Sequence, residues 1–390
     1  MSPETERHSP PLAGIRVLDF SQVVSGPICG RMLADLGADV VKIEPLEGDI
    51  IRHLSPQVGD HAMSVYFSWV NAGKRSMAVD LRNEKVAAMV RELALSSDVV
   101  LENFRPGVLD KYGMGSAELR GANPKLVYCS ISGWGADNSW SQRRAYAAMV
   151  QAEAGRVELD ARLRNAPAEQ SPHVDGDITP GLLAVSAICA ALFQRERKGH
   201  GQHLDVSMAE ALLYTDEWTS TELTHYRGPR IPDTWMYPVF VLADGSAAAF
   251  MGDPHPRLPE VAAAFTDAPI DYTDSRDDAL AILAELLARV PDFPTLEARL
   301  AEFGFLAAEV RSIAQVAETP WAKERDVFRE VEPGVHLTAA PFRTSGGSVG
   351  VRDRAPRLGE HTRAVLADRL GVSATELDEL EQSGALASPS

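Results

Sequence analysis

The order of apolar segments near the N-terminus constrains the fold more than any other feature of this chain. Residues 15–20 (IRVLDF) and 40–44 (VVKIE) have strand character. Between them, Pro27 suits the first turn of a helix that runs to about Leu36, and Gly37 suits its C-terminal cap. A strand, a helix and a strand in this order form a βαβ unit, whose two strands lie parallel. The sequence therefore predicts an α/β fold with a parallel sheet.

The same alternation continues through the first half of the chain. Asn83 is placed to cap a helix over residues 84–95. Further strand-like segments lie at residues 76–81, 98–102 and 125–131. We therefore expect a large Rossmann-like, doubly wound α/β domain over residues 12–225.

After residue 225 the pattern changes. Asp244-Gly245 lies between two strand-like segments, residues 235–242 and 246–251, which is a hairpin signal. Helical patterns follow at about 277–291 and 294–303. We expect a smaller α+β domain over residues 226–330.

Residues 331–390 are expected to return to the large domain. They show turns, a helix near residues 359–370 and then a polar tail. No internal repeat or low-complexity tract interrupts this organisation.

Charge and cysteine content exclude several classes of protein. The formal net charge is −17, which argues against a nucleic-acid binder and against attraction to an anionic membrane surface. Cys29, Cys129 and Cys189 form no CxxC pair and have apolar neighbours, so we expect core thiols in a reducing compartment. The apolar run at residues 182–193 is short for a bilayer and predicts a buried helix. With a polar, proline-rich start, these features favour a cytoplasmic protein.

The segment DGDITPG (residues 175–181) precedes that apolar run and carries the clearest chemical signal. Thr179 is placed to cap the helix, Pro180 suits its first turn, and Asp177 is expected just outside the N-terminus. Helix N–H groups favour a charged carboxylate there, and such a group can attack a thioester. An acidic residue before a helix commonly only stabilises that helix, so both roles stay open. A hard-metal cluster with His173 and Asp175 is a weaker alternative.

Seven segments in sequence order resemble the family III CoA-transferases. The family includes formyl-CoA:oxalate and carnitine CoA-transferases, and the alpha-methylacyl-CoA racemases are its relatives. The resemblance runs from Leu12 to about Leu386. It rests on PLAGIRVLDFSQVVSGPICGRMLADLGADVVKIE, NAGKRSMAVDL, ENFRPGVLDKYG, SISGWG, GDITPG, RKGHGQHLDVSMAEA and APRLGEHT.

This resemblance implies a chemistry for Asp177, which matches the family's catalytic aspartate. The carboxylate would attack an acyl-CoA to give a mixed anhydride, and the released thiolate would then give an aspartyl-CoA thioester. A carboxylic acid acceptor would leave as the new acyl-CoA. CoA would thus be a substrate rather than a tightly bound cofactor, and no metal is implied. The resemblance also implies a homodimer of two interlocked open rings.

The resemblance also implies a CoA site made from several loops. Val24 stands where some members carry a glutamine, and Pro45 replaces a family arginine, so the adenine end is expected to be held differently. The expected CoA-binding residues are Val24, Ser25, Asn71, Ala72, Gly73, Lys74, Asn103, Phe104, Arg105, Lys111, Arg143, Arg144, Ala145 and Tyr146.

The choice between transferase and racemase depends on one position. Racemases use a histidine and an aspartate as two bases, and Tyr146 stands where that histidine falls. No histidine occurs between Gly133 and Gln170, and tyrosine is a poor base at neutral pH. This favours CoA transfer, with α-proton transfer by a racemase as the alternative. His173 is expected to be a solvated loop residue.

Other classes of protein fit less well. The turn after the first strand lacks GxGxxG, which disfavours a nicotinamide dehydrogenase, and no GxSxG elbow occurs. A non-catalytic CoA-binding protein would not need Asp177. Some transferases have a glycine-rich lid in the small domain, but residues 221–235 contain only Gly228, so a lid here would be of another type.

Overall fold

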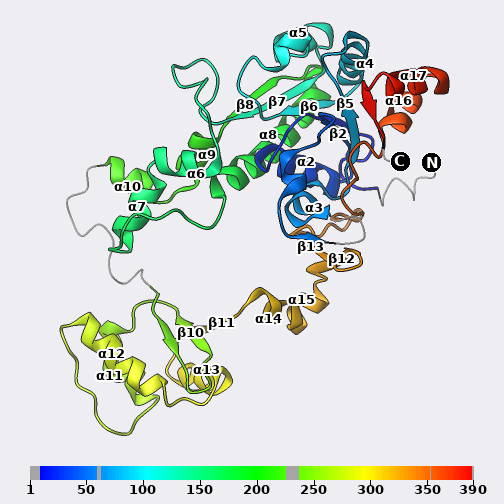
Figure 1. Ribbon diagram of the computed structural model, residues 1–390. Coiled ribbons are helices and arrows are strands. Elements are labelled where there is room, and N and C mark those ends of the chain that lie inside the picture. Colours follow the sequence, from blue (N-terminus) through cyan, green and yellow to red (C-terminus); the bar gives the residue numbers. More distant parts are fainter. Residues whose placement is uncertain (1–8, 59–62, 225–236, 352, 389–390) are drawn as a thin grey trace. The chain divides into compact units, whose positions relative to one another are not determined.

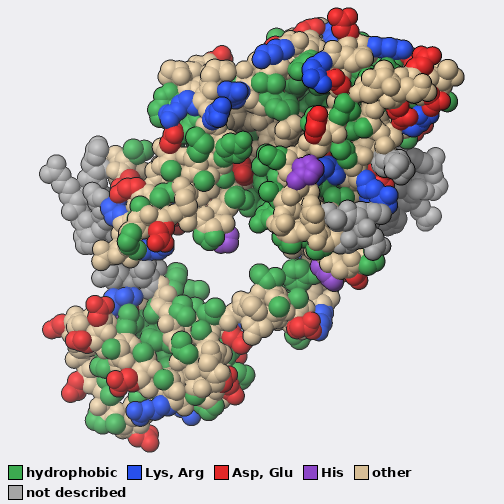
Figure 2. Space-filling model, in the orientation of Figure 1, with side chains coloured by type: hydrophobic (Ala, Val, Ile, Leu, Met, Phe, Trp, Pro, Cys, Tyr) green, Lys and Arg blue, Asp and Glu red, His purple; other side chains and the backbone are tan. Residues whose placement is uncertain are grey.

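The computed structural model describes residues 9–58, 63–224, 237–351 and 353–388. The chain forms two compact units, one of Met1–Thr219 with Arg325–Ser390 and one of Ser220–Glu324. The chain therefore leaves the first unit at Thr219 and returns at Arg325, whereas the sequence suggested changes at residues 225 and 330. Acidic and basic side chains are spread over the surface of each unit (Figure 2).

A seven-stranded sheet forms the centre of the first unit, in the order β14-β5-β2-β1-β6-β7-β8. All neighbouring strands pair in parallel except β14, which is antiparallel to β5. The expected doubly wound parallel sheet is thus confirmed. The strands are β1 (Arg16–Asp19), β2 (Asp39–Glu44), β5 (Arg75–Val79), β6 (Val99–Glu102), β7 (Val127–Ser132), β8 (His203–Ser207) and β14 (Leu386–Ala387).

Helices cover both faces of this sheet (Figure 1). The main helices of the unit are α2 (Ser25–Asp35), α3 (Val65–Asn71), α4 (Glu84–Leu95), α5 (Ser116–Ala122), α6 (Ala147–Glu153), α7 (Arg156–Leu163), α8 (Asp175–Lys198), α9 (Met208–Thr215), α16 (Thr362–Leu370) and α17 (Ala374–Gln382). Shorter elements are η1 (Ile50–His53), β3 (Gln57–Val58), β4 (Met63–Ser64), η2 (Leu109–Tyr112), β12 (Phe328–Glu332) and β13 (Val335–Thr338).

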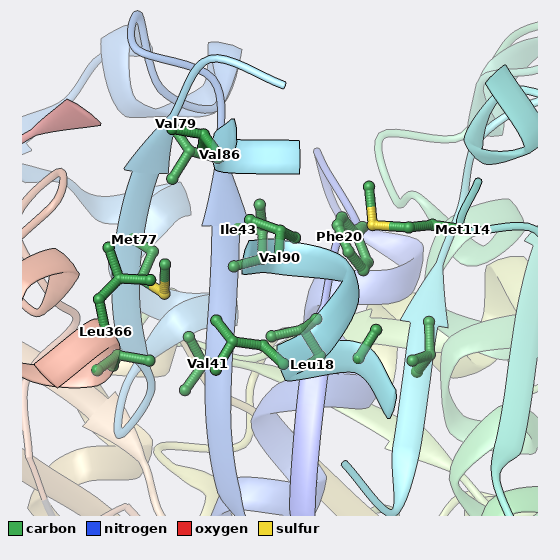
Figure 3. Packing of buried hydrophobic residues seen from close by; sticks show 14 of the residues in the cluster. Leu18, Phe20, Val41, Ile43, Met77, Val79, Val86, Val90, Met114 and Leu366 are labelled. Atoms are coloured by element: carbon green, nitrogen blue, oxygen red, sulfur yellow. The ribbon is translucent and has the colours of Figure 1, made fainter. Parts of the chain in front are cut away.

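Two apolar layers hold the helices on the sheet. Val41, Met77 and Leu18 face α4 and α16, where Val90 and Leu366 meet them (Figure 3). The opposite layer joins the other side of the strands to α2, α8 and α9. Because strand residues point alternately to the two faces, apolar residues at successive positions of these strands supply both layers.

Helix α4 begins and ends where the sequence predicted. The Asn83 side chain accepts hydrogen bonds from the backbone N–H groups of Lys85 (3.1 Å) and Val86 (3.2 Å). These bonds satisfy two of the donors that a helix start leaves free. The local signal therefore determined this boundary.

Helix α8 begins earlier than predicted, which corrects the expected cap at Thr179. The helix starts at Asp175, and the Gly176 N–H donates to the side chain of buried Gln151 on α6 (3.2 Å). Gly176 also allows α6 to come close, because a Cβ there would lie 2.9 Å from the carbonyl oxygen of Ala147. A tertiary contact thus supplies the cap, and Asp177 becomes the third residue of the helix rather than a residue outside it.

By length and composition α8 could cross a membrane. One side of it instead packs against α2, α9 and β7 inside the first unit, whereas Leu182 (41%) and Phe193 (64%), at the two ends of the run expected to be buried, are exposed. At Gly181 the axes of α8 and α2 come close, since a Cβ there would lie 2.4 Å from the Ser25 carbonyl oxygen. The N-terminal ends of the two helices are therefore neighbours.

The segment after α16 is not the polar tail that the sequence suggested. Leu377 and Leu380 of α17 are buried in the α4 layer, and β14 extends the sheet. The pattern was missed because a helix of charged residues with few apolar positions has low overall hydrophobicity.

The second unit is an α+β domain with an antiparallel sheet in the order β11-β10-β9. The expected hairpin turns at Asp244-Gly245, where Gly245 has a φ of 84°. Its elements are α10 (Thr219–Leu223, at the junction), β9 (Val239–Val241), β10 (Ala247–Phe250), η4 (His255–Arg257), α11 (Leu258–Ala263), α12 (Arg276–Leu287), α13 (Phe293–Glu302), β11 (Ala307–Val310), α14 (Ile313–Glu318) and α15 (Pro320–Glu324).

Candidate active site

A cavity of about 390 Å³ opens at the carboxyl ends of β1, β6 and β7. Strand order reverses between β1 and β6, and open α/β sheets bind ligands at such a reversal. Three loops and the first turn of α8 meet there. Residues expected at the site that line this cavity are Ser25, Asn103, Phe104, Arg105, Arg143, Arg144, Ala145, Tyr146 and Asp177.

Asp177 lies in the wall of this cavity and is 8% exposed. Within the described ranges, no hydrogen bond or ion pair reaches its carboxylate. Burial raises the pKa of this carboxyl to about 6. The N-terminus of α8 favours the charged form, but the loss of water opposes it more strongly. Asp177 is therefore a buried carboxylate that has no partner among the described residues and is ionised at neutral pH.

The β1–α2 turn forms the wall beside Asp177. Asn103 accepts the Gln22 N–H (2.8 Å) and donates both to the Gln22 carbonyl oxygen (2.7 Å) and to the Ser25 hydroxyl (3.0 Å). Asn103 thus joins the loop after β6 to the loop after β1. This residue fixes the shape of the cavity rather than leaving its amide free for a ligand.

Helix α2 starts in this turn without a side-chain cap. Among the residues placed in the structure, no acceptor receives the N–H groups of Val24, Ser25 or Gly26. Helix starts with free N–H groups are natural binding points for anions. Of these residues Ser25 lines the cavity with Asp177, so a hydrogen-bond donor and a carboxylate lie in the same wall.

Two arginines in the cavity are not neutralised by the protein. The side chains of Arg105 and Arg144 form no ion pair or hydrogen bond with any residue whose placement is described, although the Arg105 backbone carbonyl accepts the Val108 N–H. Arg143 differs, because its guanidinium bonds Glu153 (2.7 Å) and stacks on Trp140 at 4.1 Å. Arg105 and Arg144 are therefore the cations of this cavity that remain available to an anionic ligand.

Lys74 has a different place from the one expected. Its ammonium is enclosed and donates to Asp19 (2.8 Å), to the Pro27 carbonyl oxygen (2.9 Å) and to Asn71 (2.9 Å). Burial lowers its pKa to about 8 against the effect of Asp19. Since these contacts use all three donors, Lys74 lies below the site and does not line the cavity.

Four other expected CoA contacts also lie outside the cavity wall. Asn71 and Ala72 are fully buried, and Val24 is 7% exposed. Gly73 has a φ of 75° and forms the turn between α3 and β5. Val24, Asn71 and Ala72 thus belong to the interior, and Gly73 is an exposed turn residue; the sequence could not separate these positions from ligand contact.

A second cavity of about 320 Å³ adjoins the first, and Gln22 and Phe104 line both. Pro45, which follows β2, and Tyr112 of η2 contribute to its apolar wall. Lys111 lies next to it, in a hollow with Arg82 and Arg91. Among the described residues, Lys111 forms no ion pair. The sequence-based prediction did not include Gln22, Arg82 and Tyr112. Gln22 and Arg82 come shortly after predicted strands, and Tyr112 follows the expected Lys111, so their positions were the available signal.

The residues that bear on a second base are clearly placed. Tyr146 lies in the same cavity as Asp177 but is 62% exposed. No histidine lines the cavity in the part of the chain that the structure describes. His173 is exposed before α8, and the described residues contain no group of three or more His, Cys, Asp or Glu that could hold a metal. Residues 225–236, which include most of the expected lid segment, lie outside the described residues.

Comparisons with known proteins agree on one family. The model of CoA-transferase family III matches residues 12–362. The chain is 33% identical to a succinyl-CoA:mesaconate CoA-transferase of Haloarcula hispanica over 93% of this chain and 96% of that relative. It is 32% identical to an acetyl-CoA:oxalate CoA-transferase of Acetobacter aceti, over 91% and 95% of the two chains. A crystal structure of a CAIB/BAIF family protein from Brucella suis matches with a TM-score of 0.80, 30% identity, and coverage of 93% and 100%.

Proposed function

The chain belongs to CoA-transferase family III, and we propose that Asp177 is the nucleophile with which it moves CoA from an acyl-CoA to a carboxylic acid. Transfer of CoA between a thioester and a carboxylate is the activity that its relatives' names describe. The proposal concerns how this chain performs it. The observation that carries the proposal is the buried Asp177 carboxylate, which has no partner among the described residues and shares the cavity wall with the unbonded N–H of Ser25.

The proposed reaction passes through four acyl transfers. The Asp177 carboxylate attacks the thioester carbonyl carbon, the C–S bond breaks, and CoA leaves as a thiolate. The thiolate then attacks the Asp177 carbonyl of the mixed anhydride, which gives an aspartyl-CoA thioester and releases the donor acid. The acceptor carboxylate attacks this thioester, the C–S bond breaks, and a second anhydride and the CoA thiolate result. The thiolate finally attacks the acceptor carbonyl of this anhydride, which releases the Asp177 carboxylate and the new acyl-CoA. Asp177 is regenerated as a carboxylate, so no net proton or electron is required.

The site offers what these steps need. Each attack places negative charge on a carbonyl oxygen, and backbone N–H groups can stabilise such an oxyanion. The N–H group of Ser25, which lines the cavity, has no protein acceptor in the described chain. Burial of Asp177 removes water that would stabilise its charge and hydrolyse the intermediates. The raised pKa still leaves the carboxylate ionised at pH 7.

The two cavities give a path for the CoA molecule. Phe104 lies between them, and an aromatic side chain can contact the pantetheine arm or the adenine. The CoA phosphates would bind the cations that line or adjoin the cavities, namely Arg105, Arg144 and Lys111. In a chain of net charge −17, these local cations supply the attraction that the whole molecule lacks.

We also propose a cytoplasmic homodimer that uses CoA only as a substrate, without a tightly bound cofactor. Exposed apolar residues on α8 and α9, such as Phe193 (64%) and Tyr214 (82%), support a partner surface on the first unit. Light scattering tests this point: a stable species at the chain mass of 42.2 kDa would contradict it.

Trapping of the covalent intermediates tests the mechanism. The protein is incubated with a panel of acyl-CoA thioesters, treated with hydroxylamine or borohydride, digested and analysed by mass spectrometry. Since the two relatives are named for mesaconate and oxalate, dicarboxylic acids are the first acceptors to try. Modification of Asp177 supports the proposal. Absence of an adduct, with solvent deuterium entering the α-carbon of a 2-methylacyl-CoA, would instead support α-proton transfer.

A further inference from the structure

We infer that the buried ion pair of Asp49 and Lys42 is a positioning device that holds the β1–α2 turn in the conformation needed for acyl transfer. The inference rests on the proposed function, because the turn matters through its N–H groups beside Asp177. Neither residue lines the cavity, and neither is part of the chemistry described above.

The pair holds the turn from two sides. Asp49 accepts the Val23 N–H with both carboxylate oxygens (3.1 and 3.2 Å). Lys42 donates to the Ser21 carbonyl oxygen (2.6 Å) and to Asp49 (3.0 Å). Both side chains are completely buried. An ion pair of this kind costs hydration energy, and well-packed apolar residues could replace it without loss of stability. Stability alone therefore does not explain why this ion pair is present, whereas the hydrogen bonds of Lys42 and Asp49 to the turn do.

The turn contains a residue that does not adopt its conformation readily. Val23 has a φ of 65°, in the left-handed region. β-Branched residues are strongly disfavoured there, whereas glycine accepts it without strain. Unusual backbone conformations persist only where surrounding contacts enforce them, and they gather at functional sites. Asp49 bonds the N–H of this same residue, which makes it the direct constraint on the unfavourable φ.

The acidic groups around Lys42 favour its charged form. Burial opposes the charge on Lys42, but Asp49, Asp19 and Glu44 outweigh that effect and raise its pKa. Arg52, which pairs with Glu44 at 2.7 Å, completes the buried network on this side of the sheet. Lys42 therefore stays charged over the ordinary pH range.

Loss of the Asp49–Lys42 ion pair has a defined structural consequence. If Val23 relaxes to a negative φ, the peptide between Val23 and Val24 rotates, and the cavity-lining Ser25 N–H, which has no acceptor among the described residues, turns with it. Oxyanion stabilisation depends on donors held at the right place before the reaction. The expected defect is therefore in the chemical step, whereas the contacts of Arg105 and Arg144 with CoA remain.

The principal test compares Asp49→Asn with Asp35→Asn, a matched control. Asp35 is also buried, pairs with Arg31 (3.5 Å), and lies at the other end of α2. The measurements are the single-turnover rate of Asp177 adduct formation and the dissociation constant of free CoA. We expect Asp49→Asn to slow adduct formation on the order of 10²-fold and to change CoA affinity less than about threefold. Asp35→Asn should lower stability without slowing the reaction.

A second variant separates positioning from folding. The Val23→Gly variant accepts the left-handed conformation without the constraint from Asp49. The double variant Val23→Gly with Asp49→Asn should therefore form the Asp177 adduct at least about tenfold faster than Asp49→Asn alone. If Asp49→Asn does not fold, Lys42→Met combined with Asp49→Asn removes the unpaired lysine charge and takes its place. A purely structural role for Asp49 predicts no rate recovery with Val23→Gly.

The outcomes are distinguishable. A wild-type protein that forms no Asp177 adduct with any thioester overturns both the proposed function and this inference. A wild-type adduct with equal rates in Asp49→Asn and Asp35→Asn overturns the inference alone. So does a parallel loss of rate and of CoA affinity, or a failure of Val23→Gly to recover any rate.

Discussion

Two groups of charged residues in the first unit differ in whether the protein supplies a partner for each charge. The buried group consists of ion pairs: Lys42 with Asp49, Lys74 with Asp19, and Arg52 with Glu44. The cavity group consists of charges without a protein partner in the described structure: Asp177, Arg105 and Arg144. The difference teaches that residue type and strand position do not assign a role here. What separates structural from chemical charges is whether the protein itself has satisfied them.

Removal of the Asp177 charge should give the largest effect on the cavity group. Asp177→Asn keeps the shape of the side chain but cannot form the anhydride, so turnover should fall on the order of 10⁴-fold or more. Steady-state CoA transfer and adduct mapping check this. Asp35→Asn serves as the control for loss of a buried carboxylate elsewhere. Near-normal turnover in Asp177→Asn would remove Asp177 from the mechanism.

A change in the buried group should act on stability instead. Lys74→Met leaves Asp19 charged, buried and without its partner, which is expected to cost about 3–5 kcal/mol of unfolding free energy. Denaturant unfolding measures this effect. Lys111→Met is the matched control, because Lys111 forms no ion pair among the described residues, and its stability should stay close to that of the wild type. If Lys74→Met and Lys111→Met were equally stable, the distinction between buried, ion-paired charges and unpaired charges would be wrong.

The unsatisfied charge of Asp177 should also carry a pH-dependent cost. Its pKa in the folded protein is about 6, above the ordinary value of 3.8, so the folded state binds the proton more tightly than the unfolded state. The resulting stability is present below pH 3.8 and is lost as pH rises through about 6. Asp177→Asn should therefore be more stable than the wild type by about 3 kcal/mol above pH 6.

Chemical denaturation at a series of pH values tests that difference. It should shrink as pH falls from about 6 toward 4, and the rate of adduct formation in the wild type should fall over the same range. A stability difference that does not change with pH would contradict the burial of an ionised Asp177.

The arginines of the cavity should show the smallest and most selective effects. Arg105→Ala and Arg144→Ala each remove a cation that the protein leaves available, so the dissociation constant of CoA should rise about tenfold, with little loss of stability. Arg143→Ala should weaken CoA binding less, because Glu153 already pairs with Arg143. Isothermal titration with free CoA measures all three. A larger effect of Arg143→Ala than of the other two would reverse this ranking.

Sequence reasoning recovered the elements whose signals are local. The βαβ unit, helix α4 with its Asn83 cap, and the Asp244-Gly245 hairpin all depend on residues within a few positions of the boundary. The start of α8 was missed because Gln151, 25 residues earlier, supplies its cap. The segment β14 was missed because two residues gain strand structure only by pairing with β5.

The candidate site shows the same limit. Asp177 and most cavity residues follow from family motifs and from their positions after strands. Lys74 does not, because its partners Asp19, Asn71 and Pro27 come from three different elements of the fold. No periodicity in the sequence states that these partners meet. The role of a lysine in such a motif is decided by tertiary packing.

The strand β14 has a consequence for how the first unit can be made. It lies against β5 at the edge of the sheet, and Leu386 joins the same apolar layer as Leu18 and Val41. During synthesis this layer is incomplete until the ribosome has added the second unit and reached Ala387. Until then the edge of β5 is an open template for another chain. Nascent or truncated forms that stop before β14 are therefore the species that a chaperone would need to protect from aggregation.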